Sequence, residues 1–310
     1  MQITAKRLAE RESLRYRLSA WLDNERHLGI AMVLPAVVMM AALIAYPFAV
    51  AIYLALSDRM IAVSDSGRFV GLRNFVELLK DDVFRRTTLN TFNYAIVAVV
   101  FKLALGMLMA LVLNEVTVLK NFFRGILLLP WIVPTSLSTL GWLWMYDSQY
   151  SILNRILLDW GIIDKKIIWL GSPTWAMFSV QVVNIWRGIP FFGISLLAGM
   201  QTIPQDLYEA AQIDGASAWH RFWYITTPLL KPVTAVVTLF SIVQTFADFQ
   251  IVYVLTRGGP VNSTHLFATL AHQTAILGGD LGKGAAISLF MFPVLVIAVI
   301  LQLRYLQEDK

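Results

Sequence analysis

The sequence predicts an all-α polytopic membrane protein with six transmembrane helices. Its 310 residues are 57% hydrophobic and only 15% charged, and the mean hydropathy is +0.64. A water-soluble protein could not cover that much apolar surface, because polar and charged side chains normally form most of its exterior. Several apolar stretches exceed the roughly 20 residues that a helix needs to cross a bilayer. The membrane is therefore the natural solvent of this chain.

The spans can be assigned in order along these apolar stretches. Residues 28–57 carry no charged side chain and hold the first span, and the third span is rich in Trp and Pro. Lys102, Arg187 and Asp248 lie within the second, fourth and fifth spans, and the sixth is free of charge until Arg304. The predicted boundaries are 30–56, 88–114, 123–146, 175–200, 233–255 and 284–304.

Six spans place both termini on one side of the membrane, but charge does not decide which side. Cytoplasmic loops normally carry an excess of Lys and Arg. The side that holds the termini has 12 such residues and the opposite side has 11. The basic N-terminal tail alone favours a cytoplasmic N-terminus, because it holds six of them.

The composition also argues against several kinds of site. The chain has no cysteine, which rules out disulfides and thiolate metal sites, and its four histidines show no metal-ligand spacing. The net charge of +5 comes without a long basic tract, so no nucleic-acid partner is predicted. No internal repeat is visible, which counts against an inverted-repeat secondary transporter.

Three segments outside the spans are predicted to be short helices. Residues 1–27 are interpreted as a cytoplasmic or interfacial N-terminal segment before the six-helix domain at 28–310. Apolar residues recur there at helical spacing, which fits a helix on the membrane surface or a solvated charged helix equally well. Residues 72–84 and 150–159 are predicted amphipathic helices that cap the outer face. The apolar residues of the tail are Leu14, Leu18, Trp21 and Leu22.

Residues 201–232 form a polar segment between the fourth and fifth spans and are predicted to fold as a helical hairpin. Pro204 begins the first helix, and Asp206 and Glu209 lie in its first turns, where the helix dipole favours acids. Gly215 provides a left-handed stop. Ser217 caps a second helix, which Pro228 is expected to end. Composition alone fits a re-entrant or interfacial loop equally well.

The hairpin resembles the EAA signature of the permease subunits of bacterial ABC importers. In that family the pattern is E-A-A, three residues, G, nine residues, I, one residue, L-P. The positions that match are Glu209, Ala210, Ala211, Gly215, Ile225 and Pro228, and Thr227 replaces the usual Leu. "FVGLRNF" (69–75), "FFRGILLLPWIVP" (122–134), "VNIWRGIPFF" (183–192) and "VYVLTRGGP" (252–260) resemble the carbohydrate-uptake branch, of the maltose and glycerol-phosphate type.

This resemblance implies a cytoplasmic coupling hairpin that docks on an ATPase. The docking residues would be Glu209, Ala210, Ala211, Asp214, Gly215 and Ala216. The chain has no Gly-rich phosphate-binding loop, so ATP and Mg would be bound by a separate ATPase dimer, and this chain would hold no cofactor. The other implied partners are a second permease subunit, a periplasmic substrate-binding protein and membrane lipid. Both termini would face the cytoplasm of a bacterial inner membrane.

Polar residues on two spans suggest a substrate cavity. Ser241, Gln244, Thr245 and Asp248 follow i, i+3, i+4, i+7 spacing, which places them on one helix face. Gly188 and Pro190 are expected to interrupt the fourth span beside Arg187 and to free backbone groups for the cavity. Bridging between helices is the alternative for these polar groups. The family resemblance adds Trp186, Gly188 and Phe191 to the substrate contacts. Arg187 and Asp248 are expected to form an ion pair, and Lys102 is interpreted as structural.

The sequence therefore predicts a transport subunit and not an enzyme. Its substrate would be a sugar, oligosaccharide or polyol, and the alternative is an anionic glycerol-phosphate-like or sulfonated sugar. Two other classes are a stand-alone secondary transporter and a membrane-embedded transferase. The first has no use for an EAA hairpin. The second needs paired acids or a metal, and the acidic outer-loop residues Asp147, Asp159 and Asp164 form no recognised motif.

Overall fold

The computed structural model describes residues 25–307 apart from residue 117, and this part of the chain is almost entirely helical. The chain divides into two compact units, residues 1–53 and 54–310. The predicted N-terminal surface helix lies outside the described residues. One apolar helix begins in the first unit. It consists of α2 (Glu25–Met40), a π-helical turn η1 (Ala41–Ala45) and α3 (Tyr46–Ala55), and the last residues of α3 belong to the second unit.

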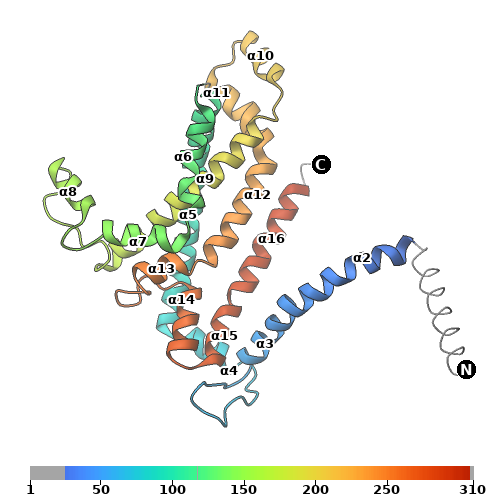
Figure 1. Ribbon diagram of the computed structural model, residues 1–310, viewed down its shortest axis with the longest axis vertical. Coiled ribbons are helices and arrows are strands. Elements are labelled where there is room, and N and C mark those ends of the chain that lie inside the picture. Colours follow the sequence, from blue (N-terminus) through green and yellow to red (C-terminus); the bar gives the residue numbers. More distant parts are fainter. Residues whose placement is uncertain (1–24, 117, 308–310) are drawn as a thin grey trace, which may run out of the picture. The chain divides into compact units, whose positions relative to one another are not determined.

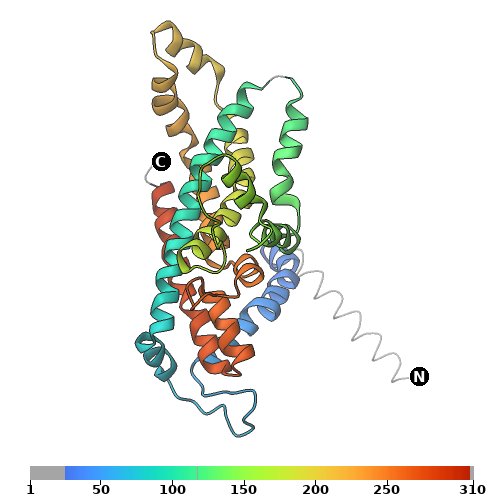
Figure 2. The same ribbon diagram turned by 90° about the vertical axis from the view of Figure 1, so that its left-hand side faces the viewer.

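The second unit contains the remaining helices. Its first half comprises α4 (Arg73–Lys80), α5 (Asp82–Glu115), α6 (Lys120–Ile132), α7 (Thr135–Met145), α8 (Ile152–Asp159) and α9 (Pro173–Met200). Its second half comprises α10 (Gln205–Ile213), α11 (Ala218–Arg221), η2 (Phe222–Thr226), α12 (Thr227–Phe246), α13 (Gln250–Leu255), α14 (Phe267–His272), η3 (Gln273–Leu277), α15 (Leu281–Leu289) and α16 (Met291–Gln307). Within this unit, α10 and α11 lie at one end and α4 and the start of α15 at the other (Figures 1 and 2).

Five helices of the described chain are long and apolar enough to cross a membrane: Glu25–Ala55, Asp82–Glu115, Pro173–Met200, Ala218–Leu255 and Leu281–Tyr305. The predicted third span is not one straight helix, because α6 and α7 meet at an angle of 88°. Pro134 disfavours a helical conformation at the residue before it, and Val133 is accordingly extended, with φ −62° and ψ 133°. Counting this bent pair as one span gives six.

Three other predicted helix boundaries are wrong. Pro228 does not end the second hairpin helix, because the chain stays helical from α11 through the π-helical turn η2 into α12, and Pro228 lies just after that turn. The predicted fifth span instead breaks at 247–249, between α12 and α13. The predicted helix at 72–84 also stops early, at Lys80, because Asp81 accepts a hydrogen bond from the N–H of Phe84 and caps α5.

The core of the second unit depends on close packing of α5 against α9. A Cβ atom at Gly106 would overlap the side chain of Phe192 and lie 3.1 Å from the backbone nitrogen of Gly193. A Cβ atom at Gly193 would lie 2.6 Å from the sulfur of Met109. Small residues at helix crossings let backbones approach closely, which is how membrane helices associate without a hydrophobic driving force.

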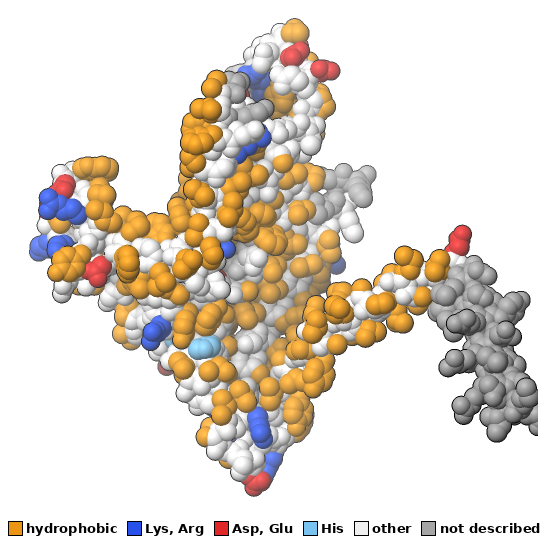
Figure 3. All heavy atoms as spheres, in the orientation of Figure 1, with side chains coloured by type: hydrophobic (Ala, Val, Ile, Leu, Met, Phe, Trp, Pro, Cys, Tyr) orange, Lys and Arg blue, Asp and Glu red, His pale blue; other side chains and the backbone are white. Residues whose placement is uncertain are grey.

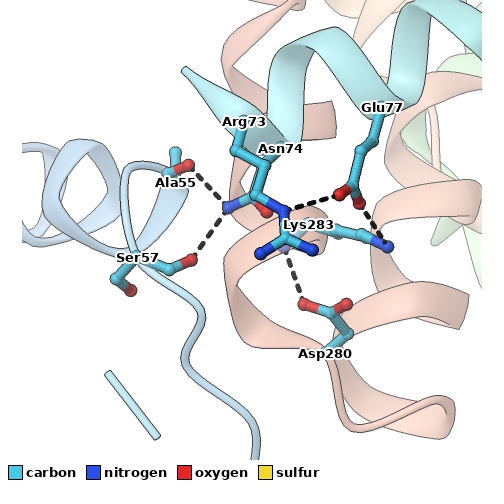
Figure 4. Close-up of polar contacts among 7 residues, drawn as sticks. All are labelled: Ala55, Ser57, Arg73, Asn74, Glu77, Asp280 and Lys283. Atoms are coloured by element: carbon cyan, nitrogen blue, oxygen red, sulfur yellow. Dashed lines mark hydrogen bonds and ion pairs between the residues drawn. The ribbon is translucent and has the colours of Figure 1, made fainter. Parts of the chain in front are cut away.

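At the α4 end, polar side chains hold three segments together (Figure 4). Buried Asn74 donates to the carbonyl oxygens of Ala55 at 2.9 Å and Ser57 at 2.8 Å, which ties α4 to the end of α3. Glu77 accepts from Arg73 at 2.8 Å and pairs with Lys283 of α15 at 2.9 Å. These contacts fix the start of α15 beside α4.

The surface of the second unit fits a membrane protein. On the face drawn in Figure 3, charged side chains gather mainly near α8, near α10 and near α4, and hydrophobic side chains cover much of the surface between them. Large apolar residues such as Val100, Val112 and Phe101 on α5 are more than half exposed. We call this exposed hydrophobic surface between the charged regions the apolar belt. It is stable only in contact with lipid or another apolar surface.

We expect Gly106→Ala to destabilise the protein by about 1–3 kcal/mol, because the added methyl group overpacks the α5–α9 contact. The measurement is the unfolding midpoint of the purified protein in detergent. Gly125→Ala is the matched control, since a Cβ atom at this helical glycine would have nothing within 4 Å, and alanine there should be neutral or slightly stabilising. Equal midpoints for the two variants would contradict the close-packing argument.

We expect a small acid sensitivity from Glu77. Hydrogen bonds from Lys283 and Arg73 lower the pKa of its carboxyl below its usual value. A carboxyl group whose pKa is lowered by folding contributes its full stabilisation at pH values above its pKa in the unfolded chain. That stabilisation is lost as the pH falls through its pKa in the folded protein. The exposed position limits the effect to less than about 1 kcal/mol. Unfolding midpoints at about pH 6 and below about pH 4 should differ less in Glu77→Gln than in the wild type, and an unchanged difference would contradict this contribution.

Candidate functional site

A cavity of about 450 Å³ opens between α5, α6, α9, α12 and the α12–α13 linker. Most of the predicted substrate residues line it: Arg187, Gly188, Phe191, Ser241, Gln244, Thr245 and Asp248. Trp186 is the exception among the predicted set. Its ring packs edge-on against Trp142 of α7, with 5.5 Å between centroids. The structure thus brings residues of the fourth and fifth predicted spans to one wall, as the sequence analysis expects.

Asp248 reaches this wall by a different route from the predicted one. Because α12 ends at Phe246, Asp248 lies in the linker and not on a continuous helix face with Ser241. One carboxylate oxygen accepts from the backbone N–H of Ile251 at 3.3 Å, at the start of α13. The helical spacing argument therefore expected Asp248 on this wall for a wrong geometric reason.

Two buried side chains from other helices hold the second oxygen of Asp248. The Tyr94 hydroxyl of α5 donates to it at 2.6 Å, and the Asn184 amide of α9 donates at 2.8 Å. Three elements thus converge on one carboxylate. The sequence analysis missed both donors, although Asn184 lies one helical turn from Arg187 and so on the same face of α9.

The predicted ion pair between Arg187 and Asp248 is absent from the described chain. Arg187 instead lies over the ring of Trp131 in α6, with its guanidinium carbon 5.1 Å from the ring centroid. Trp131 in turn stacks on Phe191 at 4.9 Å. The Nε atom of Arg187 is buried and has no hydrogen-bond partner among the described residues. The polar partners of Asp248 are instead Tyr94, Asn184 and the N–H of Ile251.

Lys102 also belongs to the cavity and not only to the helix packing. Its side chain is buried, and its ammonium donates to Thr245 at 3.0 Å and to Ser241 at 3.5 Å. The Lys102 side chain passes over Gly188, where an added Cβ atom would lie 2.6 Å from two carbons of that lysine. Gly188 therefore provides room for Lys102. It does not interrupt the helix, since α9 continues through Gly188 and Pro190.

The hairpin forms a second surface feature, at the opposite end from α4. The helix α10 ends in a Schellman turn, in which the N–H of Gly215 donates to Gln212 and that of Ala216 donates to Ala211. Gly215 has φ +79°, the left-handed conformation that this turn requires. Ser217 then caps α11 by accepting from the N–H of His220.

The turn lies beside a shallow groove of about 370 Å³ on the hairpin. Ala211, Asp214, Gly215 and Ala216 of the predicted coupling residues line this groove, whereas Glu209 and Ala210 are exposed on α10 outside it. Ile213 is 87% exposed at the tip. Among the described residues no group of three or more His, Asp or Glu side chains is placed to hold a metal ion.

Comparisons with known proteins agree with this architecture. Residues 102–307 match the family model described as "Binding-protein-dependent transport system inner membrane component". The chain is 39% identical to the trehalose/maltose transport system permease protein MalF of Thermococcus litoralis, over 91% of this chain and 94% of that one. It is 34% identical to the sulfoquinovosyl glycerol transport system permease protein SmoG of Agrobacterium fabrum, over 94% of both chains.

A solved structure shows the same fold. A chain of a bacterial ABC transporter involved in the import of the acidic polysaccharide alginate superposes with a TM-score of 0.78 at 23% identity, over 94% of this chain and 99% of that one. The family match covers most of the chain, and the relatives are matched almost from end to end. The chain therefore belongs to the inner membrane components of binding-protein-dependent transport systems, a family of multi-pass transport subunits and not of enzymes.

Proposed function

We propose that the chain is a permease subunit of an ABC importer that moves a sugar, oligosaccharide or polyol across the inner membrane. The observation that carries this proposal is the cavity wall, which combines hydrogen-bonding groups with aromatic faces in a member of this transport family. Relatives are named for trehalose and maltose and for sulfoquinovosyl glycerol, which are all carbohydrates.

The wall suits a carbohydrate because it offers both kinds of contact that a sugar ring uses. Gln244, Asn184 and Arg187 supply amide and guanidinium groups for hydroxyls, and the Oδ1 atom of Asn184 is buried without a partner. Phe191 and Phe240, with ring centroids 5.0 Å apart, supply apolar faces for C–H groups. Bridging between helices, the other reading of these polar residues, accounts for Lys102 and Asp248 but leaves Arg187 and Gln244 without a role.

The hairpin supports the proposal that ATP drives the movement from a separate subunit. In this proposal residues 201–232 face the cytoplasm, the exposed tip around Ile213 and Gly215 docks on an ATPase dimer that binds ATP and Mg, and both termini are cytoplasmic. A second permease subunit of similar fold completes the cavity. A periplasmic binding protein delivers substrate from the α4 side, and lipid surrounds the apolar belt.

The test is reconstitution of the purified complex with its binding protein in proteoliposomes. We expect ATP-dependent accumulation of a carbohydrate, and mass spectrometry of the copurified binding protein identifies it. Uptake that follows an ion gradient without ATP would favour the secondary transporter. Covalent modification of a lipid would favour the transferase.

We expect Gly215→Pro to uncouple the complex. Proline cannot adopt φ +79° and removes the N–H that closes the Schellman turn. Uptake should fall at least about tenfold while ATP hydrolysis continues and the subunit stays in the membrane, since a misplaced docking element can cost about 100-fold. Gly215→Asn is the matched control, because asparagine tolerates the left-handed region.

Glu209→Lys gives a second test of docking, because it reverses an exposed charge on α10. Uptake should fall and ATP hydrolysis should continue, as for proline at 215. Normal ATP-driven uptake in both Gly215→Pro and Glu209→Lys would remove the docking role of the hairpin.

We expect Tyr94 and Asp248 to be energetically coupled. In a double-mutant cycle of Tyr94→Phe and Asp248→Asn, the interaction energy for complex stability should be about 1–3 kcal/mol, because the hydrogen bond joins a buried hydroxyl to a carboxylate. The cycle of Arg187→Gln and Asp248→Asn should show a smaller coupling, since these two do not pair. An interaction energy between Arg187 and Asp248 larger than that between Tyr94 and Asp248 would instead support the ion pair that the sequence predicts.

A further inference from the structure

The charged side chains of the cavity do not balance. Lys102, Arg187 and Asp248 are the charged residues among those that line it, which leaves one net positive charge. Two cations on the wall of one cavity repel each other, and one carboxylate offsets only one of them. A bound anion would offset the other.

Asp248 accepts no hydrogen bond from Arg187 among the described residues. Its two oxygens accept three hydrogen bonds, from Tyr94, Asn184 and the N–H of Ile251. Lys102 is likewise engaged, since its ammonium donates to Thr245 and Ser241. The side chains of Asp248 and Lys102 therefore both make hydrogen bonds within the protein.

Arg187 is different, because its donors reach no acceptor among the described residues. The guanidinium carbon lies 5.1 Å from the centroid of the Trp131 ring, a cation–π contact, and Nε is buried without a partner. A cation–π contact uses no N–H hydrogen bond, so the terminal Nη groups stay able to donate to a ligand. That planar fork matches the oxygens of a carboxylate, sulfonate or phosphate, which it binds with two parallel hydrogen bonds.

We infer that this cavity takes an acidic carbohydrate, whose carboxylate, sulfonate or phosphate group binds the guanidinium of Arg187. The inference rests on the proposed function and narrows its substrate class. Trp131 lies beside the guanidinium, and Phe191, stacked on Trp131, continues the aromatic surface for the sugar ring. Neutral sugars lack the group that offsets the second cation, so they bind more weakly.

The experiment compares three glycosides that differ only at C6. Methyl α-glucoside carries a hydroxymethyl group there, methyl α-glucuronide a carboxylate and methyl α-sulfoquinovoside a sulfonatomethyl group. Their affinities for the assembled permease–ATPase complex in nanodiscs are measured by saturation-transfer NMR. At low salt the two anions should bind about tenfold more tightly than the neutral glycoside, because hydrogen bonds to charged groups are the stronger ones.

Variants assign the preference to Arg187. Arg187→Gln should reduce the affinity of both anions about tenfold and change that of the neutral glycoside little. Arg187→Lys keeps the charge but not the fork and should retain part of the preference. Arg257→Gln is the matched control, because Arg257 also lies over an aromatic ring, that of Tyr253, but does not line the cavity.

The outcomes separate this inference from the proposed function. Equal binding of all three glycosides, or an anion preference that survives Arg187→Gln, would overturn the inference and leave carbohydrate transport intact. Failure of all three to bind would overturn it together with the proposed carbohydrate specificity. The comparison among glycosides on the wild-type complex stands even if a variant fails to assemble.

Discussion

The arrangement of the cavity depends on the hydrogen bonds that the carboxylate of Asp248 accepts. A charge at membrane depth is costly unless protein groups or water satisfy it. Here the donors come from Tyr94 on α5, Asn184 on α9 and the first turn of α13. One buried group thereby fixes the relative positions of three elements that are far apart in sequence. It lies in the linker between α12 and α13, where the lining of the cavity changes from helix to loop.

The glycines of the helix crossing make this convergence possible. Close approach at Gly106 and Gly193 brings α5 and α9 together, and Gly188 leaves space for the stem of Lys102. Side chains of α5 and α9 therefore meet: Tyr94 and Asn184 donate to the same oxygen of Asp248, and Lys102 passes over Gly188. The apolar packing and the polar wall depend on each other, since a wider crossing would leave the buried polar groups without partners.

Hydropathy and spacing predicted most of the fold, and they failed where proline and capping chemistry decide. The spans around α5, α9 and α16 are clear because long apolar stretches have no other stable environment. Val133–Pro134 was a readable signal for the bend between α6 and α7, whereas Pro228 gave a false stop because the helix continues through it from the π-helical turn η2. The ion pair between Arg187 and Asp248 was wrong because a charge count within spans ignores neutral donors such as Tyr94 and Asn184. Those donors are recognisable only once the helices are packed.

Helix continuity supplies a physical link between the hairpin and the cavity. From residue 218 the chain is helical through η2 to Phe246, so the hairpin and the residues Ser241 and Gln244 share one element. At 1.5 Å per residue, Ser217 and Ser241 are about 36 Å apart along the axis. A tilt of about 5° at the hairpin would then move the cavity wall by about 3 Å, comparable to a hydrogen-bond length. If the helix stays rigid across the π-helical turn η2, the proposed movement of the hairpin by a partner ATPase would change contacts in the cavity without any change in secondary structure.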